Sequence, residues 1–221
     1  MEKKYKLTDE TINLCGKKLC RIKALKDFED VKKGDKGGFI EDEHNLSHDG
    51  NSWVYGDARV YGSAWVYGNA RVYGNARVYD NAWVYDNAMV YGDARVYDNA
   101  WVYDNAWVYG NARVYDNAMV YGDAMVYGNA WVYGNAWVYG NAWVYGNAKI
   151  ENNFDYIVFK NWWSSGRYFT WTRSNDMWKV GCFYGTGEEL IKKAYKDNEF
   201  SGRQYERIVK YVEEIKKENG K

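Results

Sequence analysis

The residues best suited to hold a ligand gather near the C-terminal end of the chain. Four tryptophans fall within residues 162–178, interleaved with serine, arginine and tyrosine, and a lysine follows them. An indole face stacks on a nucleobase, a guanidinium grips phosphate oxygens with two donors, and a Ser-Ser-Gly turn offers free backbone amides. The pattern predicts a ligand-binding site for a nucleotide-like anion, formed by Trp162, Trp163, Ser164, Ser165, Arg167, Tyr168, Trp171, Arg173, Trp178 and Lys179.

The same tryptophans would also serve as the core of a small domain that has few aliphatic residues. In the stretch RYFTWTR, strand alternation puts Arg167, Phe169, Trp171 and Arg173 on one face. That face either contacts a ligand or covers the core, and the sequence leaves both readings open. No Ser-His-Asp, Cys-His or metal-ligand set accompanies it, and Cys182 is expected to pack at the end of a strand. We therefore expect no catalytic residues, no metal and no cofactor.

A second group of charged residues lies within a six-residue unit that repeats from residue 53 to residue 150, most often as X-Val-Tyr-Gly-Asn-Ala. If three units close one coil, positions eighteen residues apart stack on one another. One X column then forms a possible anion track of Arg59, Arg77, Arg95 and Arg113, followed by Trp131 and Lys149. Either Asp80, Asp98 and Asp116 at the following corner neutralise these arginines, or the column holds a phosphate-bearing ligand beside a row of tyrosines.

The other X columns are aromatic. One contains Trp65, Trp83, Trp101 and Trp137, with Met119 among them, and the third mixes tryptophan, methionine and one arginine. A flat tryptophan stripe is costly to leave in water, so we expect it to pack against another subunit or against the C-terminal segment. The sequence thus predicts a homo-oligomer.

The elements that position these columns follow from the period of six, which suits a three-residue strand and a three-residue corner better than a helix. Sixteen valines in strict register, Val54 to Val144, point inward, and an alanine follows each by four residues. Gly, Asn and Asp tolerate the left-handed backbone of a sharp corner. Sixteen such units predict a parallel β-solenoid of just over five coils.

The units resemble the hexapeptide repeat of left-handed parallel β-helices, in which an aliphatic residue precedes a small one by four positions. The resemblance implies a left-handed coil with three sides. Hexapeptide acyltransferases use a histidine and usually an inserted loop, but here His44 and His48 precede an uninterrupted repeat, so acyl transfer is the least favoured function. Ice binding is set aside because the repeat has no threonine.

Both ends of the chain are expected to form separate modules. Residues 1–52 predict a β cap with a hairpin turning at Gly16-Lys17. Residues 53–150 form the solenoid. Residues 151–221 predict a small α+β domain with three strands and two helices, each helix opened by a capping box at Thr186–Glu189 and Ser201–Gln204.

The ends also resemble hexapeptide-repeat proteins that are common in phage and prophage genomes. The stretch GCFYGTGEELIKKA carries the match near the C-terminus. Near the N-terminus it rests on Asp27, Phe28, Asp30, Val31, Lys32, Gly34, Asp35, Gly37, Gly38, Phe39, Asn45, Leu46, Ser47, Gly50 and Trp53.

Composition limits the functions further. Thirty basic residues balance thirty acidic ones, so no net field favours nucleic acid or an anionic membrane. Three cysteines without CxxC spacing and the absence of an apolar leader indicate a reduced, cytoplasmic protein without a membrane span, in the host cytoplasm if phage-encoded.

Two functions remain in view. The first is a non-enzymatic, mainly β binding protein of phage type that sequesters a nucleotide-like anion, such as a host immune signal. The alternative is a structural scaffold that docks or inhibits a host protein through its aromatic faces.

Overall fold

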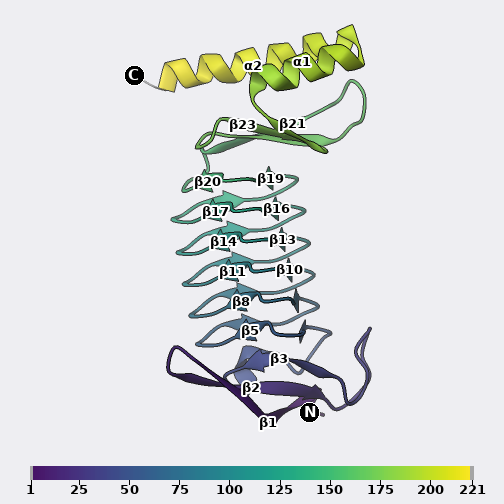
Figure 1. Ribbon diagram of the computed structural model, residues 1–221, viewed down its shortest axis with the longest axis vertical. Coiled ribbons are helices and arrows are strands. Elements are labelled where there is room, and N and C mark those ends of the chain that lie inside the picture. The colour runs from purple at the N-terminus through teal and green to yellow at the C-terminus, as the bar shows by residue number, and fades with distance from the viewer. Residues whose placement is uncertain (1, 220–221) are drawn as a thin grey trace.

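The protein has the form of a column, with the N-terminal strands at its lower end and the C-terminal helices at its upper end (Figure 1). This computed structural model describes residues 2–219. A solenoid of very short strands makes the shaft, a small sheet closes the lower end, and a second sheet covered by two helices closes the upper end. The fold is thus mainly β, a β-solenoid with different caps.

Among residues 2–219 the shaft contains seventeen two-residue strands, one more than the sixteen valine units because Lys149–Ile150 continues the series. They are β4 (Trp53–Val54), β5 (Arg59–Val60), β6 (Trp65–Val66), β7 (Arg71–Val72), β8 (Arg77–Val78), β9 (Trp83–Val84), β10 (Met89–Val90), β11 (Arg95–Val96), β12 (Trp101–Val102), β13 (Trp107–Val108), β14 (Arg113–Val114), β15 (Met119–Val120), β16 (Met125–Val126), β17 (Trp131–Val132), β18 (Trp137–Val138), β19 (Trp143–Val144) and β20 (Lys149–Ile150).

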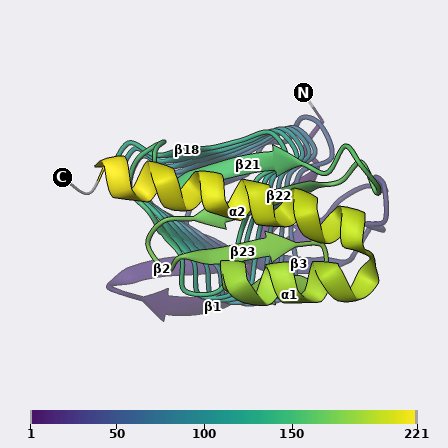
Figure 2. The same ribbon diagram turned by 90° about the horizontal axis from the view of Figure 1, so that it is seen from above.

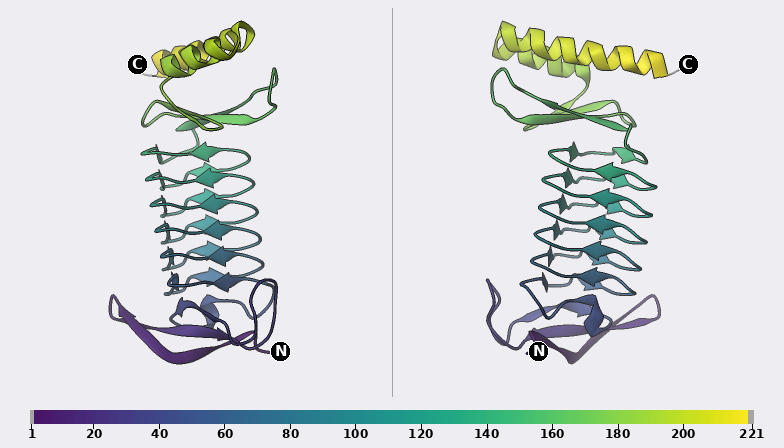
Figure 3. Two further views of the ribbon diagram at one scale, coloured as in Figure 1. Left: turned by 45° about the vertical axis from the view of Figure 1, so that its right-hand side comes forward. Right: turned by 180° about the vertical axis from the view of Figure 1, so that it is seen from behind.

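Each strand pairs in parallel with the strand three units away, so residues eighteen positions apart are neighbours, as in the pair Arg77 and Arg95. Three sheets result, and we name them by their outer side chains. The arginine face holds β5, β8, β11, β14, β17 and β20; the tryptophan face holds β6, β9, β12, β15 and β18; the mixed face holds β4, β7, β10, β13, β16 and β19. Figure 3 shows the coils stacked evenly without an inserted loop.

The interior contains the valines and alanines of the repeat, which are fully buried from Val54 to Ala148. Side chains alternate across a strand, so burying valine turns its two neighbours, X and Tyr, outward. The residue after each tyrosine adopts a left-handed backbone, which is why this corner position is restricted to glycine and aspartate; Asp104, for example, has φ of 57°.

The direction of the hydrogen bonds decides what each cap must supply. Within the shaft an N–H donates to a carbonyl of the next coil, as from Arg77 to Ala94 at 2.9 Å. The first coil therefore leaves free C=O groups at the lower end, and the last coil leaves free N–H groups at the upper end. Unpaired buried backbone groups are costly, so the lower cap must provide donors and the upper cap acceptors.

The lower cap provides donors. It consists of β1 (Tyr5–Leu14), β2 (Lys17–Ala24), β3 (Lys36–Ile40) and the 3-10 helix η1 (Glu43–Asn45). The hairpin predicted there forms, although its turn lies at Cys15-Gly16, one residue earlier than expected, because both residues adopt positive φ. β3 extends the arginine face, where the Phe39 N–H donates to the Ala58 carbonyl at 2.9 Å. The side-chain amide of Asn45 donates to the Ala64 carbonyl at 2.8 Å.

The upper cap provides acceptors. Its antiparallel sheet contains β21 (Tyr156–Lys160), β22 (Tyr168–Thr172), β23 (Met177–Val180) and β24 (Phe183–Gly185), in that order. Three side-chain oxygens of this cap each accept from the last strand of one face: Asn153 from Trp137 N–H (2.7 Å), Thr170 from Trp143 N–H (2.9 Å) and Ser174 from Lys149 N–H (2.7 Å). One face of the sheet thus closes the solenoid.

Two helices cover the other face of that sheet (Figure 2): α1 (Gly187–Asp197) and α2 (Glu199–Asn219). The capping box at Thr186 and Glu189 is confirmed, with Thr186 N–H donating to the Glu189 carboxylate at 2.9 Å. The second box was wrongly placed, because α2 begins at Glu199 and Asn198 accepts from Ser201 N–H at 2.8 Å.

The upper sheet has four strands rather than the three expected. Gly181 has φ of 55° and starts a turn with Cys182, which splits MWKVGCF into β23 and β24. Cys182 is therefore exposed in a turn and is not packed at the end of a strand. No helix within residues 2–219 has the length and apolar composition that crossing a membrane requires.

Candidate functional site

The arginine face carries the most unusual charge arrangement of the molecule. Phe39, Arg59, Arg77, Arg95, Arg113, Trp131 and Lys149 stand in direct β register on successive coils. We call the four arginines the arginine ladder. Parallel strands lie about 4.8 Å apart, so four guanidinium groups are stacked within roughly 15 Å.

The aspartates expected to neutralise this ladder do not do so. Among residues 2–219, no ion pair joins the ladder to Asp80, Asp98 or Asp116 or to any other carboxylate. Two of them instead accept from the backbone of the next coil: Asp98 from Asp116 N–H at 3.4 Å and Asp116 from Gly134 N–H at 3.0 Å. The prediction that these aspartates neutralise the arginines is wrong. An aspartate in the left-handed conformation, such as Asp116, lies close to the backbone amide of the corner above it.

One N–H group of the arginine ladder is buried without a hydrogen-bond acceptor. The Nε atom of Arg59 is buried and has no hydrogen-bond partner. Buried N–H groups are normally paired, and charged donors most of all, so this atom adds to the cost of leaving the ladder without an anion.

An aromatic residue follows the arginine ladder at each end, Phe39 below Arg59 and Trp131 above Arg113. The Trp131 ring lies between two cations, with Arg113 at 5.1 Å and Lys149 at 5.0 Å from its centroid. At the lower end, the Arg21 guanidinium lies 4.1 Å from the centroid of the Phe39 ring. These distances are those of cation–π contacts.

A column of stacked tyrosines runs beside the arginines. Tyr61, Tyr79, Tyr97, Tyr115 and Tyr133 stack with ring centroids 4.9–5.2 Å apart and rings within 7° of parallel. Burial raises the pKa of Tyr79 and Tyr115 to about 12. Tyrosine hydroxyl groups are protonated at neutral pH even without this shift, so those of the column can donate to an anion that the arginines attract.

Comparison with known families supports the architecture around this site. Eight segments match the model of the YdcK beta solenoid repeat: 54–68, 70–86, 82–96, 94–110, 106–122, 112–128, 118–134 and 130–146. The chain is a β-solenoid repeat protein. A comparison with curated proteins finds no match.

The tryptophan face of the solenoid differs from the arginine face because its outer columns carry no charge. Its X column holds four tryptophans and Met119, and Trp83 stacks on Trp101 with centroids 5.1 Å apart. Trp65 and Trp137 at its two ends are 38% and 45% exposed. The upper cap does not cover this stripe, because its sheet lies across the end of the solenoid (Figure 2).

The C-terminal residues predicted to bind a ligand do not converge. Trp171 and Trp178 are each 2% exposed and pack with Phe169 beneath the helices. Trp163 contacts Phe169 and Tyr205 edge to face, whereas Trp162 projects into solvent. Most of these tryptophans thus form the core of the upper cap, the alternative that the sequence had left open.

The polar members of that set are also dispersed. Ser164 binds the Asn161 side chain and Ser165 lies in the same turn, beside Arg167 and Tyr168 at the start of β22. Lys179 lies on the opposite face of the sheet, where its Nζ is 5.2 Å from the centroid of Tyr145, and burial lowers its pKa. Trp171 and Arg173 line a common cavity.

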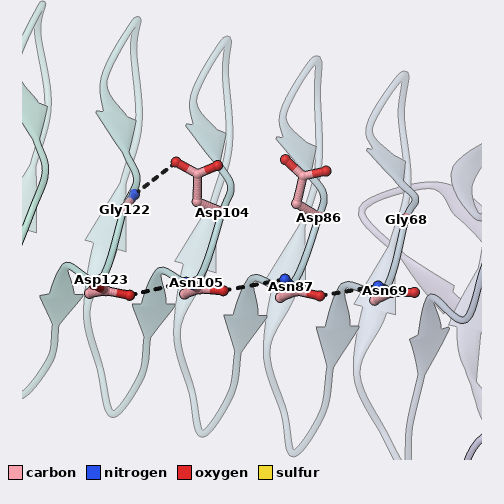
Figure 4. Close-up of a pocket in the computed structure, with 8 residues that line it drawn as sticks. All are labelled: Gly68, Asn69, Asp86, Asn87, Asp104, Asn105, Gly122 and Asp123. Carbon is pink, nitrogen blue, oxygen red and sulfur yellow. Dashed lines mark hydrogen bonds between the residues drawn. The ribbon is translucent and has the colours of Figure 1, made fainter.

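The sequence reasoning missed the polar rows along the corners. Asn69, Asn87 and Asn105 each donate to the side chain of the next coil, ending at Asp123, over 3.0–3.3 Å (Figure 4). A shallow groove of about 420 Å³ runs along this corner. Within residues 2–219, no group of three or more His, Cys, Asp or Glu side chains is placed to hold a metal ion.

Proposed function

We propose that the protein is a non-enzymatic binding protein that holds a phosphate-bearing, nucleotide-like anion along its arginine ladder. The observation that carries the proposal is the set of four stacked guanidinium groups, none of which has a carboxylate partner within residues 2–219. Guanidinium groups bind phosphate oxygens, and the stacked tyrosines beside them add hydroxyl donors. The proposal keeps the ligand class expected from sequence but moves the site from the upper cap to the shaft.

A stable solenoid is suited to sequestration, which needs affinity without turnover. The resemblance of both ends of the chain to phage hexapeptide-repeat proteins supports a phage origin and a role in removing a host immune nucleotide from the host cytoplasm. The six basic and eight acidic residues of 51–150 favour a short ligand over a long polyanion, because the surrounding field is weak.

The test is a thermal-shift and calorimetric titration against cyclic dinucleotides and trinucleotides, ADP-ribose derivatives and short polyphosphate. A ligand at a hundred times its Kd adds about 2.7 kcal/mol of stability. We expect Arg95→Gln to weaken the selected ligand at least about tenfold, since a charged hydrogen bond contributes about 1.5–3 kcal/mol. The matched control is Arg167→Gln, an exposed arginine of the upper cap.

The outcomes separate the two candidate sites. Loss of binding in Arg95→Gln with normal binding in Arg167→Gln supports the ladder. The reverse result returns the site to the upper cap, and a panel without any selective ligand removes the proposal altogether.

A second candidate function is protein docking through the tryptophan face, including assembly of a homo-oligomer. What favours it is the uncharged aromatic stripe with exposed ends at Trp65 and Trp137. Sedimentation velocity on the wild type and on a Trp83→Glu/Trp101→Glu variant tests it. A monomeric wild type, or an oligomer that persists in the variant, argues against assembly through this face.

A further inference from the structure

A separate cavity lies at the side of the upper cap, away from the arginine ladder. It has a volume of about 910 Å³ and is bounded by residues 152–154, the start of β21, the end of β22 and the C-terminal half of α2. Its size falls within the range of pockets that hold drug-sized ligands. Two residues of the predicted C-terminal site, Trp171 and Arg173, line it.

The walls of the cavity are largely apolar. Phe154 is 83% exposed, the most exposed large apolar side chain among residues 2–219. Ile157 and Trp171 also line the cavity. Tyr156 also lines the cavity, and its hydroxyl donates to the Trp137 carbonyl at 2.8 Å, so the cavity adjoins the exposed end of the tryptophan face. An apolar ligand body would cover surface that water now contacts, which is favourable.

Two cations lie in the same cavity. Arg173 is exposed, and among residues 2–219 no carboxylate lies within ion-pair distance of its guanidinium. Lys216 pairs with Asp176, which also accepts from the Trp171 indole N–H at 2.9 Å. Asp176 is thereby held by two donors, and Arg173 is left as the cation available to an incoming acid.

We propose that this cavity binds a small amphiphilic anion, an acid whose head lies on Arg173 with Lys216 nearby and whose aromatic or acyl body lies against Phe154 and Ile157. A cation beside an apolar surface matches the head and the body of such an acid. The site is independent of the arginine ladder, so either can fail without the other.

The probe for the test is 8-anilinonaphthalene-1-sulfonate, a fluorescent aromatic anion, titrated into the full chain. We expect one saturable site per chain, weakened at least tenfold by Arg173→Gln and also by Phe154→Ser. Both side chains are exposed, so the fold should persist, which circular dichroism verifies. Arg167→Gln is the matched control and should bind as the wild type does. Arg95→Gln, in the ladder, should also leave this signal unchanged.

Competition then identifies the head group. Displacement of the probe by decanoate indicates a carboxylate ligand, and displacement by phenyl phosphate indicates a phosphate ligand; either supports the proposal. Equal probe binding to the wild type and Arg173→Gln overturns it, as does a probe that neither competitor displaces.

Discussion

The stacked tyrosines make the solenoid sensitive to alkali in a way that can be calculated. Burial raises the pKa of the repeat tyrosines from Tyr61 to Tyr133 above the ordinary value of about 10, and for Tyr79, Tyr91 and Tyr115 the pKa reaches about 12. A phenolate in the column would be only partly hydrated and would face like charge one coil away. The perturbation is therefore a rise in pH from 9 to 12.

The sign follows from proton linkage. Between pH 10 and pH 12 the unfolded chain loses phenolic protons that the folded chain retains, so the free energy of unfolding falls as pH rises. The stabilising contribution is fully present below pH 10 and is lost as pH approaches 12. Two pH units correspond to about 2.7 kcal/mol per tyrosine, or about 8 kcal/mol for Tyr79, Tyr91 and Tyr115 together.

That figure is an upper bound because the rings are partly exposed, and solvent screening reduces it to roughly half, about 4 kcal/mol. Ordinary domains are stable by about 5–15 kcal/mol, so the loss is a large share of the total. We expect a cooperative alkaline transition between pH 10 and 12, in which tyrosinate absorbance and the far-ultraviolet circular dichroism change together.

Two variants sharpen the assay. Tyr91→Phe keeps the stacked ring and removes the ionisable hydroxyl, so it should gain stability over the wild type at pH 11 and match it at pH 8. Tyr211→Phe, on the exposed side of α2, should change neither value. Tyrosinate formation that is complete near pH 10 while the circular dichroism stays constant would refute the reasoning, since it would mean that the folded rings ionise freely.

Three further predictions concern the caps and the core. Thr170→Val leaves the Trp143 N–H without its acceptor and should lower the free energy of unfolding, measured in urea, by about 1–3 kcal/mol. Thr170→Ser keeps the hydroxyl and should retain most of that free energy. Equal stability of Thr170→Val and the wild type would show that water replaces the hydroxyl. Burial lowers the pKa of Lys4 to about 8, so between pH 8 and 10.5 the unfolded chain holds the Lys4 proton more tightly than the folded chain does. The free energy of unfolding should therefore rise by about 2 kcal/mol from pH 7.5 to 9.5. The Lys4→Met variant should lack this rise, and a rise of the same size in the variant would contradict the assignment to Lys4. Val102→Ala should cost about 1–3 kcal/mol in calorimetry because the neighbouring coils cannot close around the missing methyl groups, and a cost below about 0.5 kcal/mol would mean that the column relaxes.

Much of the fold could be read from residue spacing. The period of six determined the strands, the buried valine and alanine columns, and the eighteen-residue register that lines up Arg59 with Arg113. Local capping chemistry also predicted the start of α1 at Thr186. These features depend on neighbours that are close in sequence or repeat at a fixed interval, and such patterns are visible in one dimension.

The candidate site was less accessible to such reasoning. The composition of residues 162–178 suits either a ligand pocket or a core, because tryptophan and arginine serve both. The choice depends on which face of β22 the helices cover, and Trp171 and Trp178 proved to be beneath them. The partners of the arginine ladder were also misjudged, since the corner backbone, and not the spacing, directs Asp116 toward the amide above it.

The sequence by itself determined a repeating shaft with a cationic column on one side and an aromatic column on another. Only the tertiary structure decided that the lower cap donates and the upper cap accepts hydrogen bonds, and that Phe154 and Arg173 meet in one cavity. It also showed that the ladder arginines have no carboxylate partner in the described part of the chain, residues 2–219. The physical reason is that a repeat fixes neighbours one coil apart. The direction of free backbone groups and the contacts between the caps and the shaft depend on how distant segments pack.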